Sequence, residues 1–435
     1  MLSLKNKKIL VMGLGLNNGG LGVCQWLAKH KYEFLVTDLR SAEVLKPTIR
    51  KLTRSPITYR LGCHTYEDFD WADVIIQNPG VPEDSPYLKY ARKKGKLIIN
   101  EAVLFFWHCR GNIIGITGSR GKSTTASFLY QLLKSKKKGV RLTGNIAKEP
   151  FMQIVDGIKK SDIVVAELSS WHLERLQDYK ISPHIAVLTN IFPEHLNRYP
   201  SMAAYVKAKQ AITKNQKASD YFITIKSNAY CRRIATASKA KKVVISEQSE
   251  SCRYLKLPGE HNCQNLSLAL AVTQLLGFQD SDFATQISHL KGLPFRLQVI
   301  KSQLPMTVIN DSASTSPDAL TAAVQALRGS RILLLTGGVN KNLSYRQAAA
   351  SIKSSVSYCL LLPGTASDDL KRNLRSLRYP TKRLILVKNL QQARREIGRV
   401  LKSEKFDYLL FSPGAASFNL FLNEFDRGHS FNRVF

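Results

Sequence analysis

Residues 115–125, GITGSRGKSTT, carry the side-chain types of a phosphate-binding loop. Glycines allow backbone N–H groups to turn toward phosphate oxygens, Lys122 would reach the outer phosphates, and the Ser123 hydroxyl would ligate Mg²⁺. An apolar run at 112–116 predicts a strand before the loop, and STTASFLYQLL predicts a helix after it. The usual pattern requires a further glycine where this chain has Ile116. We therefore predict a nucleotide-phosphate site of a variant type rather than a turn of small residues.

Three side chains downstream of this loop could share its chemistry. Glu167 lies near the end of the run DIVVAEL, at the carboxyl end of a predicted strand, where a metal-bound nucleotide would lie. His195 lies just beyond the next strand, IAVLTN, and helical spacing in AAYVKAKQAI could point Lys209 toward the same edge. Each also has an ordinary explanation: a helix-start glutamate, a structural histidine, and a solvated lysine in a lysine-rich chain.

A βαβ pattern begins the chain. A strand at Ile9–Met12 runs into glycines 13, 15, 19 and 20, a helical stretch follows, and a second strand ends at Asp38. The GxGxxG fingerprint fails because Asn18 stands at its third glycine position, so dinucleotide binding does not follow. The turn is explained equally well as a ligand loop or as a tight strand-to-helix connection. A third strand, ADVIIQ, meets the loop NPGVPEDSP at a strand end, where open α/β sheets bind ligands.

Strands and helices alternate through the rest of the chain. The later strands are NIIGI, DIVVAEL and HIAVLTN in a second block, and MTVINDS, RILLLTGG, YCLLLPG, RLILV and YLLFSPG in a third. We predict an α/β fold of three consecutive α/β domains, each with a mostly parallel sheet. The predicted domains are residues 1–106, 107–292 and 293–435.

Composition narrows the class of protein. The chain has 435 residues, 44% of them hydrophobic, and 64 Lys and Arg against 32 Asp and Glu, a formal charge of +32. Such a charge can indicate nucleic-acid binding, but the basic residues are scattered and form no basic tail, so this stays a minor alternative. Seven single cysteines without a CxxC pair are typical of a reducing cytoplasm. The N-terminus predicts a strand rather than a signal peptide, and no apolar stretch is long enough to predict a membrane span.

The ordered set of motifs resembles the Mur ligases over nearly the whole chain. Its members are GITGSRGKSTT, ELSSWHLE, TNIFPEHLNRY, YVKAK, GEHNCQN, GLPFRLQ, NDSASTSPDA, TGGVNK and SPGAASFNLF. The N-terminal GLGL, TDLR and NPGVP resemble the branch of this family that adds glutamate to UDP-N-acetylmuramoyl-L-alanine. The family's loop resembles GTxGKS/T and lacks the outer P-loop glycine, which accounts for Ile116.

The resemblance implies a role for each matching position. The implied catalytic residues are Lys122, Glu167, His195 and Lys209, and the implied metal ligands are Ser123, Glu167, His195 and Lys209. The implied ATP-binding residues are Gly118, Ser119, Arg120, Gly121, Lys122, Ser123, Thr124, Asn262, Asn265, Arg296 and Asp311. The UDP-sugar would contact Gly15, Leu16, Asp38, Arg40, Asn78, Pro79, Gly80, Asn145 and Ser170, and glutamate would contact Lys341 and Ser417.

The resemblance also implies an activity, ATP-dependent amide ligation in cytoplasmic peptidoglycan precursor synthesis. A Rossmann-like N-terminal domain would bind the UDP substrate, a P-loop-like central domain would bind ATP, and a Rossmann-like C-terminal domain would bind glutamate and close over ATP. ATP would convert the alanyl carboxylate to an acyl phosphate, which the glutamate amine would attack. The implied cofactors are ATP and two Mg²⁺ ions, with Lys209 carbamylated, and the implied state is a monomer without an obligatory nucleic acid or a membrane span.

Four positions depart from the family pattern. Phe295 replaces the histidine of GLPHR, Arg120 replaces a loop asparagine, Ala313 replaces the lysine of NDSKAT, and Glu424 stands where an aromatic contact to glutamate is frequent. The phosphate and metal positions are intact, so we expect an active enzyme rather than an inactive Mur-like scaffold. Ala313 removes a cation and Glu424 adds an anion where glutamate would bind, so the stereochemistry of the added glutamate stays open. D-glutamate is favoured, and an L-glutamate-adding ligase of the same family is the alternative.

Overall fold

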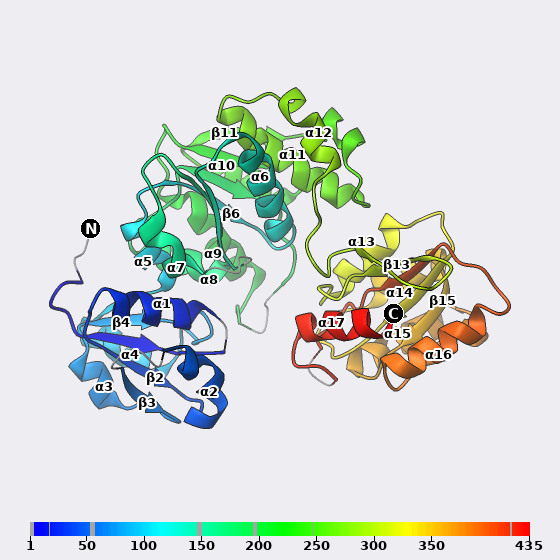
Figure 1. Ribbon diagram of the computed structural model, residues 1–435, viewed down its shortest axis with the longest axis horizontal. Coiled ribbons are helices and arrows are strands. Elements are labelled where there is room, and N and C mark those ends of the chain that lie inside the picture. Colours follow the sequence, from blue (N-terminus) through cyan, green and yellow to red (C-terminus); the bar gives the residue numbers. More distant parts are fainter. Residues whose placement is uncertain are drawn as a thin grey trace. The chain divides into compact units, whose positions relative to one another are not determined.

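The computed structural model describes residues 4–16, 18–52, 57–145, 150–194, 198–246, 248–417 and 420–435. The chain divides into two compact units (Figure 1). One comprises Met1–Cys252 with Asn265–Ile287, and the other comprises Arg253–Gln264 with Ser288–Phe435. The first unit contains two sheets and the second contains one.

The N-terminal sheet has the strand order β3-β2-β1-β4-β5, and all of its strands are parallel. Its strands are β1 (Ile9–Met12), β2 (Phe34–Asp38), β3 (Thr58–Leu61), β4 (Val74–Gln77) and β5 (Leu97–Ile99). The helices of this part are α1 (Asn18–Lys29), α2 (Ala42–Ile49), η1 (Arg50–Leu52), α3 (Tyr66–Trp71), α4 (Pro86–Lys93) and α5 (Glu101–His108). The continuous apolar runs of β1 and β4 are buried throughout, as expected for parallel strands that helices cover on both faces.

The central sheet has the order β11-β10-β9-β6-β8-β7 and is also parallel. Its strands are β6 (Asn112–Thr117), β7 (Val140–Gly144), β8 (Ile163–Glu167), β9 (Ile185–Leu188), β10 (Tyr221–Ile225) and β11 (Lys241–Ile245). Its helices are α6 (Lys122–Lys136), α7 (Phe151–Ile154), η2 (Val155–Gly157), α8 (Ser170–Asp178), α9 (Met202–Lys214), α10 (Ala229–Ala237), η3 (Glu250–Tyr254), α11 (Glu260–Leu275), η4 (Asp280–Phe283) and α12 (Ala284–Ser288). The ends of β6, β8 and β9 therefore lie side by side at one edge of this sheet.

The C-terminal sheet has the order β12-β13-β17-β14-β15-β16, and only its edge strand β12 is antiparallel to its neighbour among the described pairs. Its strands are β12 (Gln298–Ile300), β13 (Thr307–Asn310), β14 (Ile332–Thr336), β15 (Val356–Leu361), β16 (Leu384–Leu386) and β17 (Tyr408–Phe411). Its helices are α13 (Pro317–Ala326), α14 (Arg346–Ser355), α15 (Thr365–Ser376), η5 (Thr381–Arg383), α16 (Leu390–Val400) and α17 (Glu424–Val434). The sheet separates two apolar cores: α13, α14 and α15 cover one face, and α16 and α17 cover the other.

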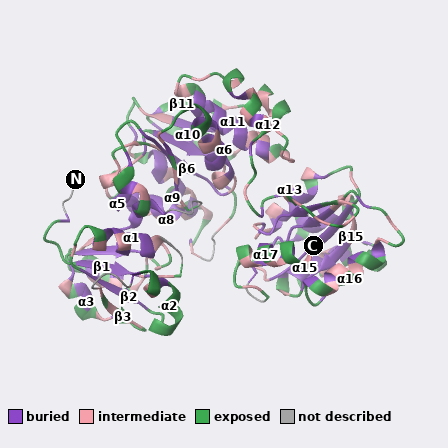
Figure 2. Ribbon diagram, viewed as in Figure 1, coloured by how far each residue is buried: buried purple, intermediate pink, exposed green. Residues whose placement is uncertain are grey.

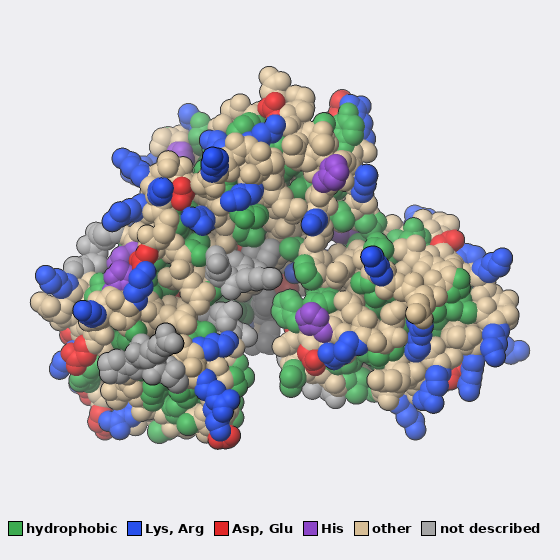
Figure 3. Space-filling model, viewed as in Figure 1, with side chains coloured by type: hydrophobic (Ala, Val, Ile, Leu, Met, Phe, Trp, Pro, Cys, Tyr) green, Lys and Arg blue, Asp and Glu red, His purple; other side chains and the backbone are tan. Residues whose placement is uncertain are grey.

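The predicted fold class is confirmed, because three consecutive sheets of mainly parallel strands alternate with helices, and the inner strands of each sheet are largely buried (Figure 2). The domain limits at 106 and 292 stay predictions. Basic side chains are spread over the visible face of both units (Figure 3), in keeping with their scatter along the sequence. In the part of the chain that the structure describes, no helix has the length and apolar character needed to cross a membrane.

Candidate active site

The phosphate-loop candidate joins β6 to α6, and two of its glycines have backbone conformations that other residues rarely adopt. Gly118 has φ +150° and Gly121 has φ +76°. A Cβ atom at Gly118 would lie 1.9 Å from Thr189 Oγ1, and one at Gly121 would lie 2.2 Å from Asn265 Oδ1. Any side chain there would collide with these neighbours, so the geometry requires both glycines.

The segment after β9 holds this loop in place. Asn190 accepts a hydrogen bond from the Ser119 N–H through its carbonyl at 2.8 Å, and from the Arg120 N–H through Oδ1 at 2.9 Å. The Ser119 hydroxyl donates to the Phe192 carbonyl at 3.1 Å. Gly121 is the N-cap residue of α6, and no side chain caps this end of the helix. The N–H groups of the first turn of α6 are thus the ones oriented to receive an anion, as in other phosphate sites at helix N-termini.

Lys122 and Glu167 lie at this same edge, where the adjacent strands β6 and β8 end. The Lys122 ammonium donates to the Ser119 carbonyl at 2.7 Å, so the side chain folds back over the loop. Glu167 is 1% exposed, and neither carboxylate oxygen has a hydrogen-bond partner among the described residues. A buried carboxylate without donors strongly favours a nearby cation.

Lys209 is buried on α9 rather than solvated, which rules out the surface alternative considered from the sequence. Its Nζ lies 4.9 Å from the centroid of the Tyr205 ring. Burial, followed by repulsion from Lys122, lowers the pKa of Lys209 well below its ordinary value, while Glu194 and Glu167 act in the opposite direction. The structure therefore brings Lys209 into the electrostatic environment of Lys122 and Glu167.

The predicted ligand His195 lies outside the described residues. Within the described ranges, no group of three or more His, Cys, Asp or Glu side chains could enclose a metal ion. Of the four predicted metal ligands, Ser123, Glu167 and Lys209 are described. Ser123 is the second residue of α6, directly after Lys122, at the end of the sheet where Glu167 terminates β8.

Asn145 and Ser170, both predicted to contact the UDP-sugar substrate, lie close to Glu167. The Asn145 N–H donates to the Glu167 carbonyl at 3.3 Å. Ser170 begins α8, three residues after Glu167, and is 3% exposed. Both residues therefore lie near the end of β8, the strand that carries the buried carboxylate of Glu167.

Asp38 organises the predicted UDP-binding edge of the N-terminal sheet. Its Oδ2 accepts a hydrogen bond from the Gly15 N–H at 2.9 Å, and its Oδ1 accepts one from the Arg40 N–H at 2.9 Å. These bonds fix the loops that follow β1 and β2. Leu16, next to Gly15, is exposed. Each oxygen of the Asp38 carboxylate therefore already accepts a backbone hydrogen bond, and these two bonds stabilise the loops after β1 and β2.

The loop after β4 is held from two sides. The Asn78 N–H donates to the Met12 carbonyl at 2.9 Å, and Asn78 Oδ1 accepts from the Gly80 N–H at 3.1 Å. From the central sheet's part of the chain, the Arg198 guanidinium donates to the Pro79 carbonyl at 3.1 Å. A side chain near the candidate catalytic edge therefore positions a predicted substrate loop.

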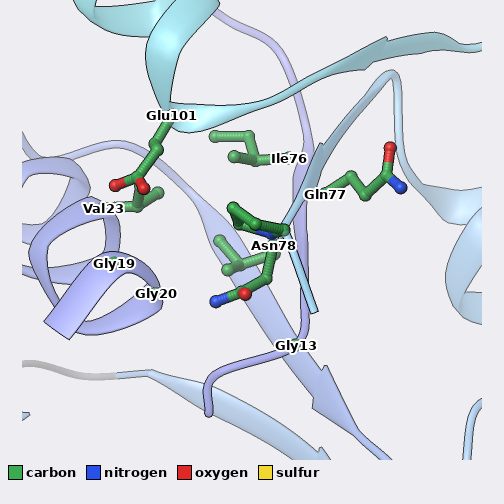
Figure 4. Close-up of a pocket in the computed structure, with 10 residues that line it drawn as sticks. Gly13, Gly19, Gly20, Val23, Ile76, Gln77, Asn78 and Glu101 are labelled. Atoms are coloured by element: carbon green, nitrogen blue, oxygen red, sulfur yellow. The ribbon is translucent and has the colours of Figure 1, made fainter. Parts of the chain in front are cut away.

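A small pocket lies between β1, β4 and the first turn of α1, where the strand order reverses (Figure 4). Glu101, the first residue of α5, points into it beside Gly19. Glu101 Oε1 lies 3.3 Å from His172 Nε2, while Oε2 has no partner among the described residues. Because His172 Nδ1 accepts from the Ser169 N–H at 3.3 Å, its Nε2 carries the proton that faces Glu101.

The two predicted adenine-side asparagines lie on α11 but have different contacts. Asn265 Oδ1 accepts from the Thr125 hydroxyl at 3.3 Å and lies against Gly121. The Asn262 amide donates to the Pro258 carbonyl at 2.7 Å. Asn265 thus touches the phosphate loop directly, whereas Asn262 belongs to the C-terminal unit.

Arg296 lies in a strained turn of the C-terminal unit. Its neighbours Phe295 and Leu297 have φ +61° and +43°, in the region that side chains disfavour. The turn is tied to Asp311, whose carboxylate accepts from the Leu297 N–H at 3.1 Å and from the Ser412 hydroxyl at 2.8 Å. Burial raises the pKa of Asp311 to about 7, although these hydrogen bonds act to lower it.

Lys341 and Ser417, the predicted contacts of the incoming amino acid, lie on loops that are joined. Val339 and Ala416 form an antiparallel bridge with hydrogen bonds of 3.0 Å in both directions. These loops follow β14 and β17, which are neighbours in the C-terminal sheet. Lys341 is exposed and Ser417 is 3% exposed. The fold therefore brings together two residues that are far apart in the sequence.

Comparisons with known proteins identify the family. The description "Mur ligase MurD-like, N-terminal domain" matches residues 7–100, and "Mur ligase middle domain" matches residues 116–255. The chain is 31% identical over 465 residues to the UDP-N-acetylmuramoylalanine–D-glutamate ligase of Roseiflexus sp. (strain RS-1), with 100% of this chain and 99% of the relative covered. It is 32% identical over 462 residues to the ligase of the same name from Borreliella burgdorferi (strain ZS7), with 99% and 98% covered. This chain belongs to the Mur ligase family.

The fold of this Mur ligase is also that of a solved family structure. The MurF ligase from Thermotoga maritima, crystallised in complex with ADP, matches with a TM-score of 0.62 at 16% identity, over 92% of this chain and 94% of that one. At this identity the likeness shows the shared fold, in agreement with the three α/β sheets.

Several residues that contact the site of this Mur ligase were not predicted from the sequence. Asn190 had a usable signal, because it ends the strand-like run IAVLTN beside the phosphate loop's own strand. Nothing in the sequence indicated that Glu101 is special, because acidic residues are common at helix starts. Arg198 and Tyr205 become site residues only through contacts with Pro79 and Lys209.

Proposed function

We propose that this Mur ligase joins D-glutamate to the alanyl carboxylate of UDP-N-acetylmuramoyl-L-alanine, with ATP converted to ADP and phosphate. The observation that carries the proposal is the pair of buried side chains Glu167 and Lys209, with the half-buried Lys122, at the end of the central sheet where β6 and β8 terminate. The shared name of the full-length relatives at 31% and 32% identity supports the choice of substrate and of amino acid. The enzyme would act as a cytoplasmic monomer in peptidoglycan precursor synthesis.

The phosphate loop would bind ATP through backbone and charge. The first turn of α6 offers uncapped N–H groups at the positive end of the helix dipole. Lys122 is held 2.7 Å from the Ser119 carbonyl and would move little to reach the outer phosphates. The close contacts at Gly118 and Gly121 keep the loop in the shape that a phosphate needs.

The residues at this edge fit magnesium. Glu167 is a buried carboxylate whose two oxygens have no hydrogen-bond partner in the described part of the chain, and carboxylate oxygen is a preferred Mg²⁺ ligand. Ser123 would add a hydroxyl, and His195 would serve a second ion. When bound, Mg²⁺ would offset the negative charge of the transferring phosphoryl group.

Lys209 would be carbamylated. A lysine must lose its proton before its nitrogen can attack CO₂, and burial favours the neutral amine here. The nitrogen would form a bond to the CO₂ carbon and release one proton. The product is an anionic carbamate, which replaces the neutral amine beside Lys122 with a carboxylate-like group able to serve a metal ion.

The ligation itself would proceed in two displacements. An oxygen of the alanyl carboxylate would attack the γ-phosphorus of ATP, and ADP would leave. The glutamate amine would then attack the acyl carbon, lose a proton, and displace phosphate as the amide bond forms. Lys122 would offset charge in the first step. The loop of Asn78, Pro79 and Gly80, which Arg198 holds, would orient the UDP end of the substrate.

The test is product formation with defined substrates. Purified protein is incubated with ATP, Mg²⁺ and UDP-N-acetylmuramoyl-L-alanine, and D- or L-glutamate is offered separately. We expect phosphate release and a product heavier by one glutamate residue with the D isomer. Turnover with the L isomer alone would establish the alternative ligase, which the changes at Ala313 and Glu424 leave open. No product with either isomer would refute the proposal.

A pair of lysines on α6 provides the matched control. Lys122→Ala removes the charge nearest the outer phosphates, so turnover should fall at least about a hundredfold while the fold is kept. Lys134→Ala changes an exposed lysine at the far end of the same helix and should leave turnover unchanged. Equal activity of the two variants would contradict the assignment of the loop.

A further inference from the structure

Arg427 on α17 is one of the most deeply buried charged side chains in the C-terminal unit, at 1% exposure. Its guanidinium donates to the Ser312 carbonyl at 2.7 Å and to the Ser312 hydroxyl at 3.1 Å. It also donates to the Ala415 carbonyl at 2.9 Å and, at 3.4 Å, to the Ser314 carbonyl. One side chain therefore holds the loop after β13 and the loop after β17.

A third loop is connected to these two. The bridge between Val339 and Ala416 joins the loop after β14, which carries Lys341, to the loop that Arg427 holds. The Tyr345 hydroxyl adds a bond of 2.7 Å to the Gly414 carbonyl. The strands β13, β17 and β14 are consecutive in the sheet, so their carboxyl ends form one continuous edge. Open α/β sheets bind their ligands at such edges.

Within the residues that the structure describes, Arg427 forms no ion pair with a carboxylate. All four of its hydrogen-bond acceptors are neutral, and no carboxylate among the described residues lies within ion-pair distance. Burial lowers the pKa of Arg427 to about 10, with Glu424 and Asp311 acting against the shift, so the group stays charged at neutral pH. Fully buried arginine is normally paired with a carboxylate. An anionic ligand at this edge would supply the missing charge.

We infer that Arg427 is a positioning residue for the incoming amino acid: it fixes the 312–314 and 415–417 loops and supplies the positive charge that attracts the ligand's carboxylates. The inference rests on the proposed function, because it takes the dianion D-glutamate as the ligand. Arg427 would act through the loops and through its field, since its donors are engaged with the backbone. It compensates for Ala313, which offers no cation on the 312–314 loop.

Two substitutions separate the charge from the hydrogen bonds. Arg427→Lys keeps the charge but cannot make all four bonds. Arg427→Gln removes the charge but keeps an amide donor. The matched control is Arg433→Gln, which changes an exposed arginine on the same helix. For each protein, the KM values of D-glutamate, ATP and the UDP substrate are measured together with kcat and the thermal midpoint.

We expect Arg427→Gln to raise the KM of D-glutamate by about ten- to a hundredfold, the range of one desolvated charged contact. The KM values of ATP and of the UDP substrate should stay within about twofold. Arg427→Lys should recover most of the loss, and Ala313→Lys placed in the Arg427→Gln background should recover part of it. The Arg433→Gln control should resemble the wild type.

Several outcomes would overturn the inference. Equal KM changes for all three substrates would indicate a general loss of structure. An unchanged KM for D-glutamate in folded Arg427→Gln would remove the electrostatic role. If Arg427→Gln does not fold, Arg427→Lys decides the matter, because KM values of ATP and of the UDP substrate that rise as much as the KM of D-glutamate would overturn the inference. Wild-type protein that makes no product would instead refute the proposed function.

Discussion

Replacing Lys209 by methionine should stabilise the first unit near neutral pH and abolish ligation. Lys209 is 2% exposed, and burial lowers its pKa well below the ordinary value. In the unfolded chain the same amine is solvated and protonated, so folding requires the loss of a proton or the burial of a charge. Methionine has a similar length, fills the same space, and carries no charge. This candidate catalytic residue is thus expected to reduce the stability of its own unit.

The pH dependence of the stability difference between the wild type and Lys209→Met follows from the one proton that the Lys209 amine binds. Below the ordinary lysine pKa of 10.5 the unfolded chain binds a proton that the native state tends to release, so wild-type stability rises as the pH approaches that value. A difference of one bound proton between the unfolded and native states changes the free energy of unfolding by about 1.4 kcal/mol per pH unit. The stability advantage of Lys209→Met should therefore shrink by up to this amount for each unit between pH 7 and pH 9. Buffers freed of CO₂ keep carbamate formation from adding to the wild-type slope.

Tryptophan fluorescence provides the assay, because all four tryptophans, at positions 26, 71, 107 and 171, lie in the first unit. Urea unfolding is followed at pH 7, 8 and 9 for the wild type, Lys209→Met and Lys207→Met. Lys207 is exposed on the same helix, so its variant should follow the wild-type slope and keep its activity. Parallel pH dependences for wild type and Lys209→Met would refute the reasoning, as would full activity in the latter.

Three further substitutions test other parts of the structure. Gly121→Ala should cost about 1–2 kcal/mol for the positive φ alone, displace Asn265, and raise the KM of ATP in steady-state assays. Asp311 has its pKa raised to about 7 by burial, so its stabilising contribution is complete below about pH 4 and is lost as the pH rises through 7. Asp311→Asn should flatten the fall in C-terminal stability across that window, measured by hydrogen exchange of β13. Arg175→Met should destabilise the first unit by about 1.5–3 kcal/mol, because it removes the 2.6 Å bond to Gln77, and an unchanged urea midpoint would contradict this.

The strands and the phosphate loop were predictable because they depend on neighbouring residues. Runs such as ILVM in β1 and IAVL in β9 are buried throughout, and parallel strands covered on both faces need that continuous apolar pattern. Gly118 and Gly121 were recognisable because a phosphate loop needs backbone conformations that glycine readily adopts. The roles of the individual site residues stay predictions, and His195 lies outside the described residues.

The sequence by itself determined the succession of three α/β blocks, the position of the nucleotide loop, and the order of motifs that mark a Mur ligase. Tertiary structure alone decided which charged side chains are buried. Lys207 and Lys209 are two residues apart on one helix, yet only Lys209 faces Tyr205 and the buried Glu167. Arg427 likewise contacts both a near loop, at the Ala415 carbonyl 12 residues away, and a distant one, at the Ser312 carbonyl 115 residues away in the chain. Strand patterns and glycine conformations are local properties, whereas the pKa of a side chain depends on the distant segments that exclude water from it.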